Sequence, residues 1–371
     1  MTPVVLTRGG RPLRMIKLGT VVVLTVVAVV LPLYYPPYRV FQFSEVLVFA
    51  VAVLSLNLLT GYTGQISLGH NFFFAIGAYT TAIVLRDVQV TFVVPLLLAF
   101  AVSFVVGYLV GIPALRLSGV YLALVTIALA VITPPVITRF EGLTGGAQGI
   151  NIDKPAAPGW TGLEDDQWVY YICLVVAVIV FLVARNLVRG TTGRSMTAVR
   201  DNELAARTMG VDPAVPKTLT FAYSAGFAGV AGALYTMVIG LVAPQSFTLL
   251  LAINLLVGTV IGGMATIAGA VFGAAFIIYV PVLASDLNPA LGGVIYGAAL
   301  VLAMFVVPGG VLGLARRIRT RFVTIQEPDE ARRADAAASE PGSEPGSEPP
   351  PQEPPADRHP APTGDQRENG S

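Results

Sequence analysis

The chain has 371 residues, of which 54% are apolar and only 12% are charged, whereas about a quarter of the residues of an average soluble domain are charged. The net charge of +1 indicates neither a nucleic acid nor an acidic partner. The single cysteine, Cys173, excludes an internal disulfide and a cysteine-built metal site. Stretches 18–36 and 47–85 contain no Asp, Glu, Lys or Arg. Because a spanning helix needs about 20 mostly apolar residues, the sequence predicts an integral membrane protein.

In chain order, residues 1–17 form a predicted cytoplasmic segment with four basic residues, and the apolar stretch after it is too long for a signal peptide. We therefore predict an all-α membrane protein of about ten transmembrane helices. The predicted spans cover residues 18–36, 42–62, 66–86, 92–115, 119–138, 168–187, 218–240, 249–265, 268–284 and 292–308. The glycines of the pair in 249–284 also fit a re-entrant or broken element, so the number of spans there stays open.

The basic residues predict the orientation, because cytoplasmic loops are enriched in Lys and Arg. With ten spans, both termini lie in the cytoplasm if the N-terminus does. The inner side then carries four basic residues before the first span, one at Arg116, six from Arg185 to Lys217 and four from Arg316 to Arg321. The outer side carries Arg39, Arg86, Arg139 and Lys154, and its long loop 139–167 is otherwise acidic.

The composition changes after the last predicted span. A transmembrane domain of residues 18–315 is followed by a predicted cytoplasmic tail of residues 316–371. From about residue 326 this tail is rich in Pro, Glu, Ser, Ala and Gly and has almost no large apolar side chain. Such a segment cannot bury enough surface to offset its chain entropy, so we predict that it is disordered.

The source of energy for any transport is constrained by missing motifs. The chain has no G-x-x-x-x-G-K-[ST] phosphate loop, so we do not expect it to hydrolyse ATP or to be an enzyme. Within the predicted spans the only acid is Glu45, close to the outer end of its helix, where interfacial placement or pairing with Arg39 accounts for it. Ion coupling thus lacks its usual carboxylates, which favours a separate energising subunit.

The segment GRSMTAVRDNELAARTMGVDPAVPK (193–217) is suited to receive such a subunit. Asp201 is a good N-cap and Gly210 a good helix end, which predicts a short helix Asp201–Gly210. One face carries Leu204, Ala205, Thr208 and Met209. A helix this short is marginal alone, so it docks either on the energising subunit or on its own membrane domain or the lipid headgroups. The candidate coupling residues are Arg200, Asp201, Asn202, Glu203, Leu204, Ala205, Arg207, Met209 and Gly210.

A second motif, NLLTGYTGQISLGHNFFFAIGAY (57–79), places polar groups among glycines. Such groups should not face lipid, so they either satisfy the backbone of a broken helix or line a substrate path. The candidates are Asn57, Gly61, Gln65, Ser67, Gly69, His70 and Asn71. His70 fits a hydrogen-bonded structural histidine better than a proton shuttle, and no second histidine or carboxylate nearby supports a metal site. We expect no cofactor.

These motifs make the sequence similar to a known family. It resembles the permease family of bacterial ABC importers for branched-chain and other hydrophobic amino acids, in particular its LivM-type members. The resemblance rests on NLLTGYTGQISLGHNFFFAIGAY (57–79), SGVYLALVTIALAVI (118–132), LTGGAQGI (143–150), GRSMTAVRDNELAARTMGVDPAVPKTLTFAYSAGFAGVAGALY (193–235) and PQSFTLLLAINLLVGTVIGGMATIAGAVFGA (244–274), which together span most of residues 40–315.

The resemblance implies a permease in the bacterial inner membrane that forms half of a translocation path. Its partners would be a second, similar permease, two cytoplasmic ATPases and a periplasmic or lipid-anchored substrate-binding protein. The resemblance also implies that Asp201–Gly210 is the coupling helix on an ATPase. Two alternatives stay open: a related permease for urea or short amides (or, more distantly, sugars), and a stand-alone carrier or channel.

Overall fold

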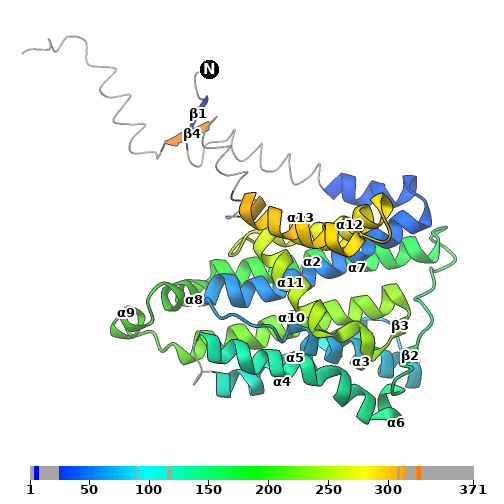
Figure 1. The fold of residues 1–371 in the computed structure, drawn as a ribbon, viewed down its shortest axis with the longest axis horizontal. Helices are drawn as coiled ribbons and strands as arrows, with labels where there is room; N and C mark the ends of the chain where they lie inside the picture. Colours follow the sequence, from blue (N-terminus) through cyan, green and yellow to red (C-terminus); the bar gives the residue numbers. More distant parts are fainter. Residues whose placement is uncertain are drawn as a thin grey trace, which may run out of the picture.

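The computed structural model of the protein describes residues 4–7, 25–88, 90–114, 119–306, 310, 311, 313 and 323–326. This part of the chain is mainly α-helical (Figure 1). In chain order, the helices are Thr25–Tyr34, α2 (Pro37–Thr63), α3 (His70–Asp87), α4 (Val93–Ala114), α5 (Val120–Arg139), α6 (Glu141–Thr144), α7 (Asp165–Arg189), α8 (Thr191–Asp201), α9 (Glu203–Thr208), α10 (Ala214–Ile239), the 3-10 helix η1 (Pro244–Phe247), α11 (Leu249–Gly262), α12 (Gly269–Leu287) and α13 (Gly292–Val306).

Four short strands modify the all-α prediction. β2 (Ile150–Asn151) and β3 (Leu241–Val242) pair antiparallel, and β1 (Val4–Thr7) and β4 (Val323–Gln326) pair parallel. Apart from β1 and β4, the predicted N-terminal segment 1–17 and the tail predicted to be disordered from about residue 326 lie outside the described residues. The prediction is therefore right for the helical bundle and incomplete at these two ladders.

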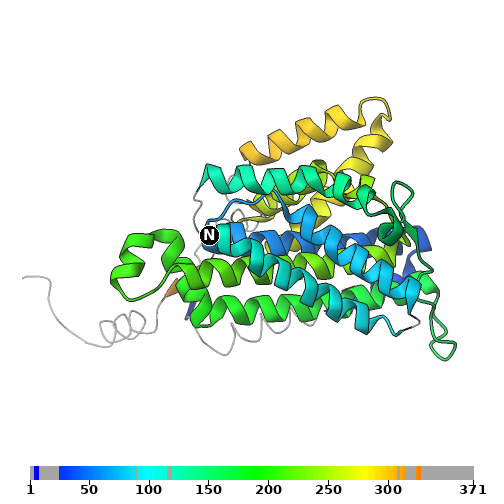
Figure 2. The same ribbon diagram turned by 90° about the horizontal axis from the view of Figure 1, so that it is seen from below.

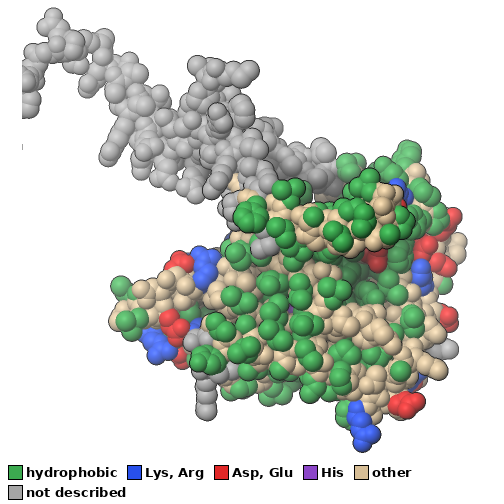
Figure 3. Space-filling model, viewed as in Figure 1, with side chains coloured by type: hydrophobic (Ala, Val, Ile, Leu, Met, Phe, Trp, Pro, Cys, Tyr) green, Lys and Arg blue, Asp and Glu red, His purple; other side chains and the backbone are tan. Residues whose placement is uncertain are grey.

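Each predicted span overlaps a helix of the structure, and six of the described helices are long and apolar enough to cross a membrane. These six are α2, α4, α5, α7, α10 and α12, whereas Thr25–Tyr34, α11 and α13 are apolar but shorter in the part that the structure describes. Charged side chains gather mainly toward the two ends of the helices, with hydrophobic side chains between them (Figure 3). The chain is therefore a multi-pass membrane protein.

Two of these helices form the centre of the bundle. In their most apolar stretches, 78% of the residues of α2 and 83% of those of α10 are buried, compared with 28% in α4, α5, α7 and α12. α10 packs against α2, α3 and α4, while α7, α11 and α12 pack on other sides of α2. The outer helices therefore offer apolar surface to the membrane, and the two central ones carry the core.

Glycines set how closely α3 and α10 approach. A Cβ atom added to Gly77 of α3 would lie 1.9 Å from the carbonyl oxygen of Gly229, and one added to Gly232 of α10 would lie 1.9 Å from that of Phe74. Only a residue without a side chain fits at such backbone contacts, which small residues commonly allow between membrane helices.

The bundle has two different ends. α8 and α9 project beyond one end, at the left of Figure 1, and the view in Figure 2 shows the same protrusion. The long loop after α5, which contains α6 and β2, lies at the opposite end and is tied by β2 to β3 (Figure 1). Segments 57–79 and 193–217 are thus both anchored to one bundle, and only the second protrudes from it.

Candidate functional site

The junction between α2 and α3 interrupts the helical backbone. α2 ends at Gly64, whose φ of 70° places it in the left-handed region, and residues 64–69 are not helical before α3 begins at His70. Glycine adopts this conformation without the steric cost that other residues meet. The predicted path or broken-helix residues all lie on or beside this junction.

His70 links three helices through both of its ring nitrogens. Its Nδ1 lies 3.1 Å from Ser67 Oγ, and its Nε2 lies 2.6 Å from Ser224 Oγ of α10. Ser224 donates its hydroxyl hydrogen to the carbonyl oxygen of Ser55 in α2 at 2.5 Å. The proton between His70 and Ser224 therefore belongs to Nε2, which leaves Nδ1 to accept from Ser67. This series of hydrogen bonds joins α2, α3 and α10 through side chains that are completely buried.

Asn71 completes the backbone of a neighbouring helix. Its Nδ2 donates to the carbonyl oxygens of Ala130 at 3.1 Å and Phe247 at 2.9 Å. Pro134 of α5 has no N–H for the carbonyl of Ala130, four residues earlier, so Asn71 supplies the missing donor. The other side-chain atom of this residue, Oδ1, is buried without a protein partner.

Asn57 and Gly61 hold the turn between α11 and α12. Asn57 Oδ1 accepts from the backbone N–H of Ala265 at 2.8 Å, and its Nδ2 donates to the carbonyl oxygen of Thr266 at 2.8 Å. A Cβ atom on Gly61 would lie 2.4 Å from the nitrogen of Ala265. Ala265 is the one described non-glycine residue with a positive φ, 57°. The end of α2 thus fixes a turn that lies about 200 residues later in the chain.

The remaining junction residues face α5 and the protein interior. A Cβ atom on Gly69 would lie 2.8 Å from the carbonyl oxygen of Thr126, and the N–H of Leu68 donates to Thr126 Oγ1 at 3.0 Å. Gln65 Nε2 is buried without a protein partner. The seven predicted residues lie on or beside the α2–α3 junction but contact different parts of the chain: Asn57 and Gly61 the α11–α12 turn, Gly69 and Asn71 α5, and His70 α10. The sequence reasoning missed the partners Ser55, Thr126 and Ser224 because they belong to other segments.

The segment 193–217 contains two helices rather than one. The prediction that Asp201 caps the coupling helix is wrong, since Asp201 is the last residue of α8. Asn202 instead is extended, with φ of −159°, and its Oδ1 accepts from the N–H of Ala205 at 3.0 Å as the N-cap of α9. α8 itself was missed, although its buried residues Gly193, Met196 and Val199 recur every three positions, as on one face of a helix.

α9 presents apolar side chains to the outside. The exposed fractions of Leu204 and Met209 are 74% and 84%, whereas Ala206 on the opposite side of this turn is buried. α9 ends at Thr208 with Met209 as its C-cap, and Gly210, with φ of 80°, follows in the left-handed region. Leu204 and Met209 lie at the protruding end of the molecule, and no described part of the chain covers them.

Ion pairs hold α9 against α10. Glu203 Oε1 accepts from Arg207 Nη2 at 2.9 Å, and Glu203 Oε2 accepts from Lys217 Nζ of α10 at 2.6 Å. The hydrogen bond from Lys217 is the main reason that the pKa of Glu203 lies below its usual value, and Arg207 adds to it. The helix is therefore oriented by charges on one side while its apolar side chains face away.

Arg200 points inward, although the sequence grouped it with the residues that contact a partner. Its Nη1 donates to the carbonyl oxygen of Gly61 in α2 at 2.9 Å, while its Nε and Nη2 both donate to Asp201 Oδ1. A Cβ atom on Gly64 would lie 3.0 Å from Arg200 Cγ. α8 is thus bonded to the α2–α3 junction directly.

Comparison with known proteins identifies the family of this chain. Residues 40–304 match the family described as the branched-chain amino acid transport system permease component. The chain belongs to this family. The match covers both the α2–α3 junction and the α8–α9 segment, so both are parts of the permease-family domain. No solved structure matches the chain.

The relatives include permeases that are named for different imported compounds. The chain is 32% identical over 316 residues to the high-affinity branched-chain amino acid transport system permease protein LivM of Salmonella typhimurium, covering 79% of this chain and 74% of that protein. It is 31% identical to LivM of Escherichia coli over 318 residues, or 80% and 75%. It is 27% identical to the autoinducer 2 import system permease protein LsrC of Salmonella choleraesuis over 245 residues, or 62% and 67%.

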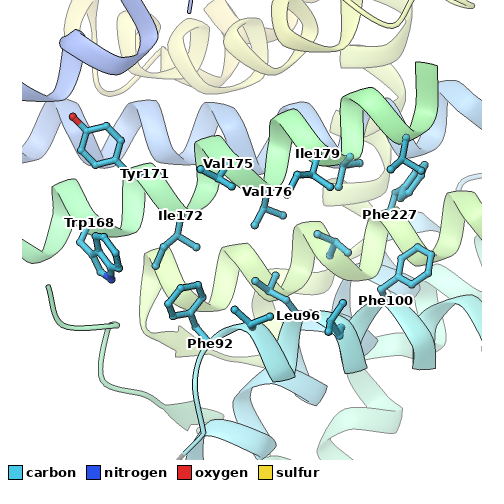
Figure 4. Close-up of a pocket in the computed structure, with 15 residues that line it drawn as sticks. Phe92, Leu96, Phe100, Trp168, Tyr171, Ile172, Val175, Val176, Ile179 and Phe227 are labelled. Atoms are coloured by element: carbon cyan, nitrogen blue, oxygen red, sulfur yellow. The ribbon is translucent and has the colours of Figure 1, made fainter. Parts of the chain in front are cut away.

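The permease domain also has a large apolar groove, of about 640 Å³, between α4 and α7 with α10 behind them (Figure 4). Phe92 and Trp168 lie toward one end of it, and Phe100 and Phe227 toward the other (Figure 4). Its lining is almost entirely apolar. A zwitterionic amino acid would lose its hydration there without gaining polar partners, so the groove does not fit such a substrate.

Proposed function

We propose that the chain is a transmembrane permease subunit of an ATP-driven ABC importer for branched-chain or other hydrophobic amino acids. It forms half of the translocation path in the bacterial cytoplasmic membrane. A second permease subunit, two cytoplasmic ATPases and a periplasmic or lipid-anchored binding protein complete the importer. The family membership and the two LivM relatives support the class of substrate. ATP is hydrolysed by the partner subunits.

The observation that carries the coupling role is the exposed pair Leu204 and Met209 on α9. Two large apolar side chains at the tip of a protruding helix gain free energy when another surface covers them. Beside them, Arg207, Gly210, Val211, Asp212 and Pro213 line an open depression of about 380 Å³. An ATPase that binds Leu204 and Met209 would therefore also contact this depression, and the charged side chains of Arg207 and Asp212 there would add polar contacts to the apolar ones.

Ten spanning segments with both termini in the cytoplasm place α8 and α9 on the ATPase side. The excess of basic residues around these helices and the acidic loop 139–167 at the opposite end support this orientation. Cysteines introduced at Trp160 and Thr191, each in a Cys173→Ser background, test it. We expect an impermeant thiol reagent to label only Trp160→Cys in intact cells. Labelling of Thr191→Cys from outside contradicts the orientation.

The coupling proposal predicts a specific effect of Leu204→Glu. A charge at this position would have to be buried against the ATPase without a partner, at a cost of about 2–7 kcal/mol for even a neutral polar group. We expect the complex purified through a tag on this chain to lose its ATPases, and uptake of leucine to stop. The measurement is the amount of ATPase per inserted permease.

Two variants control for indirect effects. Leu204→Met keeps an apolar side chain and should retain the ATPases. Trp160→Glu places the same charge on a residue that is 85% exposed at the opposite end, and should retain them too. Wild-type ATPase binding by Leu204→Glu would show that α9 is not the dock.

One observation keeps a second substrate class in view. The LsrC relative belongs to an autoinducer 2 import system, so members of this family differ in what they import. Competition of leucine uptake by unlabelled amino acids, autoinducer 2, urea and short amides in cells separates these classes. A stand-alone carrier, in contrast, would transport leucine when this chain alone is placed in liposomes, where we expect no transport.

A further inference from the structure

The contacts of Arg200 lie within the chain, so they suit a function other than binding of the ATPases. α8 and α9 have polar side-chain bonds to two spanning helices: Arg200 to α2 and Glu203 to Lys217 of α10. α2 and α10 are the two most buried of the candidate spans. Force applied to the protruding segment therefore reaches the two central helices through these bonds, in addition to α7, which leads into α8 and packs against it.

The acceptor of Arg200 lies at a sensitive position. The carbonyl of Gly61 belongs to the last turn of α2, where carbonyl groups have no partner within the helix and where the helix dipole favours a positive charge. Arg200 therefore caps α2 from a different segment of the chain. With an exposed fraction of 33%, its side chain is partly withdrawn from water and held in place by Asp201.

Gly61 connects this cap to the rest of the junction. Added to Gly61, a Cβ atom would touch both Asn57 Oδ1 and the backbone of Ala265, so no space separates α2 from the α11–α12 turn. On the other side of the cap, residues 64–69 lead to Ser67 and His70. A displacement of Arg200 thus acts at the point where α2 ends, α3 begins and the α11–α12 turn is fixed.

Resting on the proposed function, we propose that Arg200 is the positioning residue that passes movement of the ATPase-bound α8–α9 segment to α2 and to the α11–α12 turn. The ATPases bind through the apolar tip of α9, and Arg200 links that tip to the junction. Docking and transmission are therefore carried by different residues of the same segment.

The test measures ATPase binding, ATP hydrolysis and leucine uptake on the whole importer, purified through a tag on this chain and placed in liposomes with its binding protein. In Arg200→Ala we expect the ATPases to co-purify and hydrolyse ATP, and the leucine transported per ATP to fall about tenfold, within the usual range of coupling between sites. Arg200→Lys keeps a positive donor and should recover part of the ratio. Arg194→Ala is the matched control, since Arg194 also lies on α8 and its side chain has no hydrogen bond or ion pair within the described chain.

Several results would overturn the proposal. One is an unchanged ratio of leucine to ATP in Arg200→Ala, even if less protein inserts, because Arg200 would then serve stability alone. Another is loss of the ATPases in Arg200→Ala, which would place Arg200 in the dock. Failure of the docking hypothesis is read separately, from ATPase binding by Leu204→Glu, so the two proposals do not fail together.

Discussion

The α2–α3 junction and the α8–α9 segment differ in which side chains lie in an unfavourable environment. At the junction, polar side chains lie inside an apolar bundle. Asn57 is bonded to the α11–α12 turn, and His70 and Asn71 are bonded to groups of other helices. In the α8–α9 segment, the apolar side chains of Leu204 and Met209 lie at the surface. The polar side chains of the junction find their partners within the chain, whereas we propose that Leu204 and Met209 are covered by another subunit.

This contrast separates stability from assembly. Breaking a buried hydrogen bond leaves its partner without water or protein, so the folded state itself loses free energy. Changing an exposed side chain leaves the isolated chain nearly as stable as before. Variants of the junction should therefore lower the free energy of unfolding of the permease, and variants of α9 should leave the permease folded but without its ATPases. The predictions below test this division in order of the size of their effect.

The largest effect is expected where no side chain fits. Gly77→Ala brings a methyl group within 1.9 Å of the Gly229 carbonyl oxygen and forces α3 and α10 apart. Overpacking of this kind costs about 1–3 kcal/mol or more. We expect a lower thermal midpoint in detergent and less protein in the membrane. Gly297→Ala on α13 is the matched control, since no atom lies within 4 Å of its added methyl group, and equal midpoints of the two variants would contradict the close contact.

A smaller but specific loss is expected at Asn57. Asn57→Leu keeps the size of the side chain and removes both of its bonds to the α11–α12 turn. The N–H of Ala265 and the carbonyl of Thr266 are left without these partners. Because both residues are only half-buried, water replaces part of the loss, and the cost is about 1–2 kcal/mol in total, toward the low end of the range for a buried group. Thermal unfolding and hydrogen exchange of residues 263–268 measure this loss. Asn186→Leu, at an exposed position of α7, should change neither.

Helix positions could be predicted from the sequence because each depends on a local run of apolar residues. All ten predicted ranges overlap a helix, and the boundaries differ where caps intervene. α8 was missed because its apolar positions are few, and Asp201 was taken for a cap because Asp and Asn are both good N-caps. Which of two adjacent caps is used depends on where the preceding helix ends, and that is decided by the burial of Met196 and Val199.

The partners of the polar residues could not be predicted in the same way. The motif 57–79 shows that its polar groups must avoid lipid, and Asn57, His70 and Asn71 are indeed bonded to other parts of the chain. The choice between a path and a set of backbone contacts depends on atoms far away in the chain. Ser224, for instance, is 154 residues from His70, and nothing local in either segment indicates their contact.

The smallest effect is expected in the ion pairs that orient α9. Glu203 is 40% exposed, so its pair with Lys217 is partly screened and contributes at most about 1 kcal/mol. The pKa of Glu203 is lowered in the folded protein, first by the bond from Lys217. The stabilisation is therefore complete above the unfolded pKa of the carboxyl group and disappears as the pH falls through the folded value.

A double-mutant cycle with Glu203→Gln and Lys217→Gln isolates this contribution. At pH 7 we expect a coupling of a few tenths of a kcal/mol to about 1 kcal/mol in thermal unfolding. Below the ordinary carboxyl pKa of 4.5, the coupling should decline toward zero. A coupling that stays constant down to pH 3 would mean that the charge of Glu203 does not hold α9 in place. The apolar tip would then be oriented by the packing of α8 and Ala206, and its dock would be insensitive to acid.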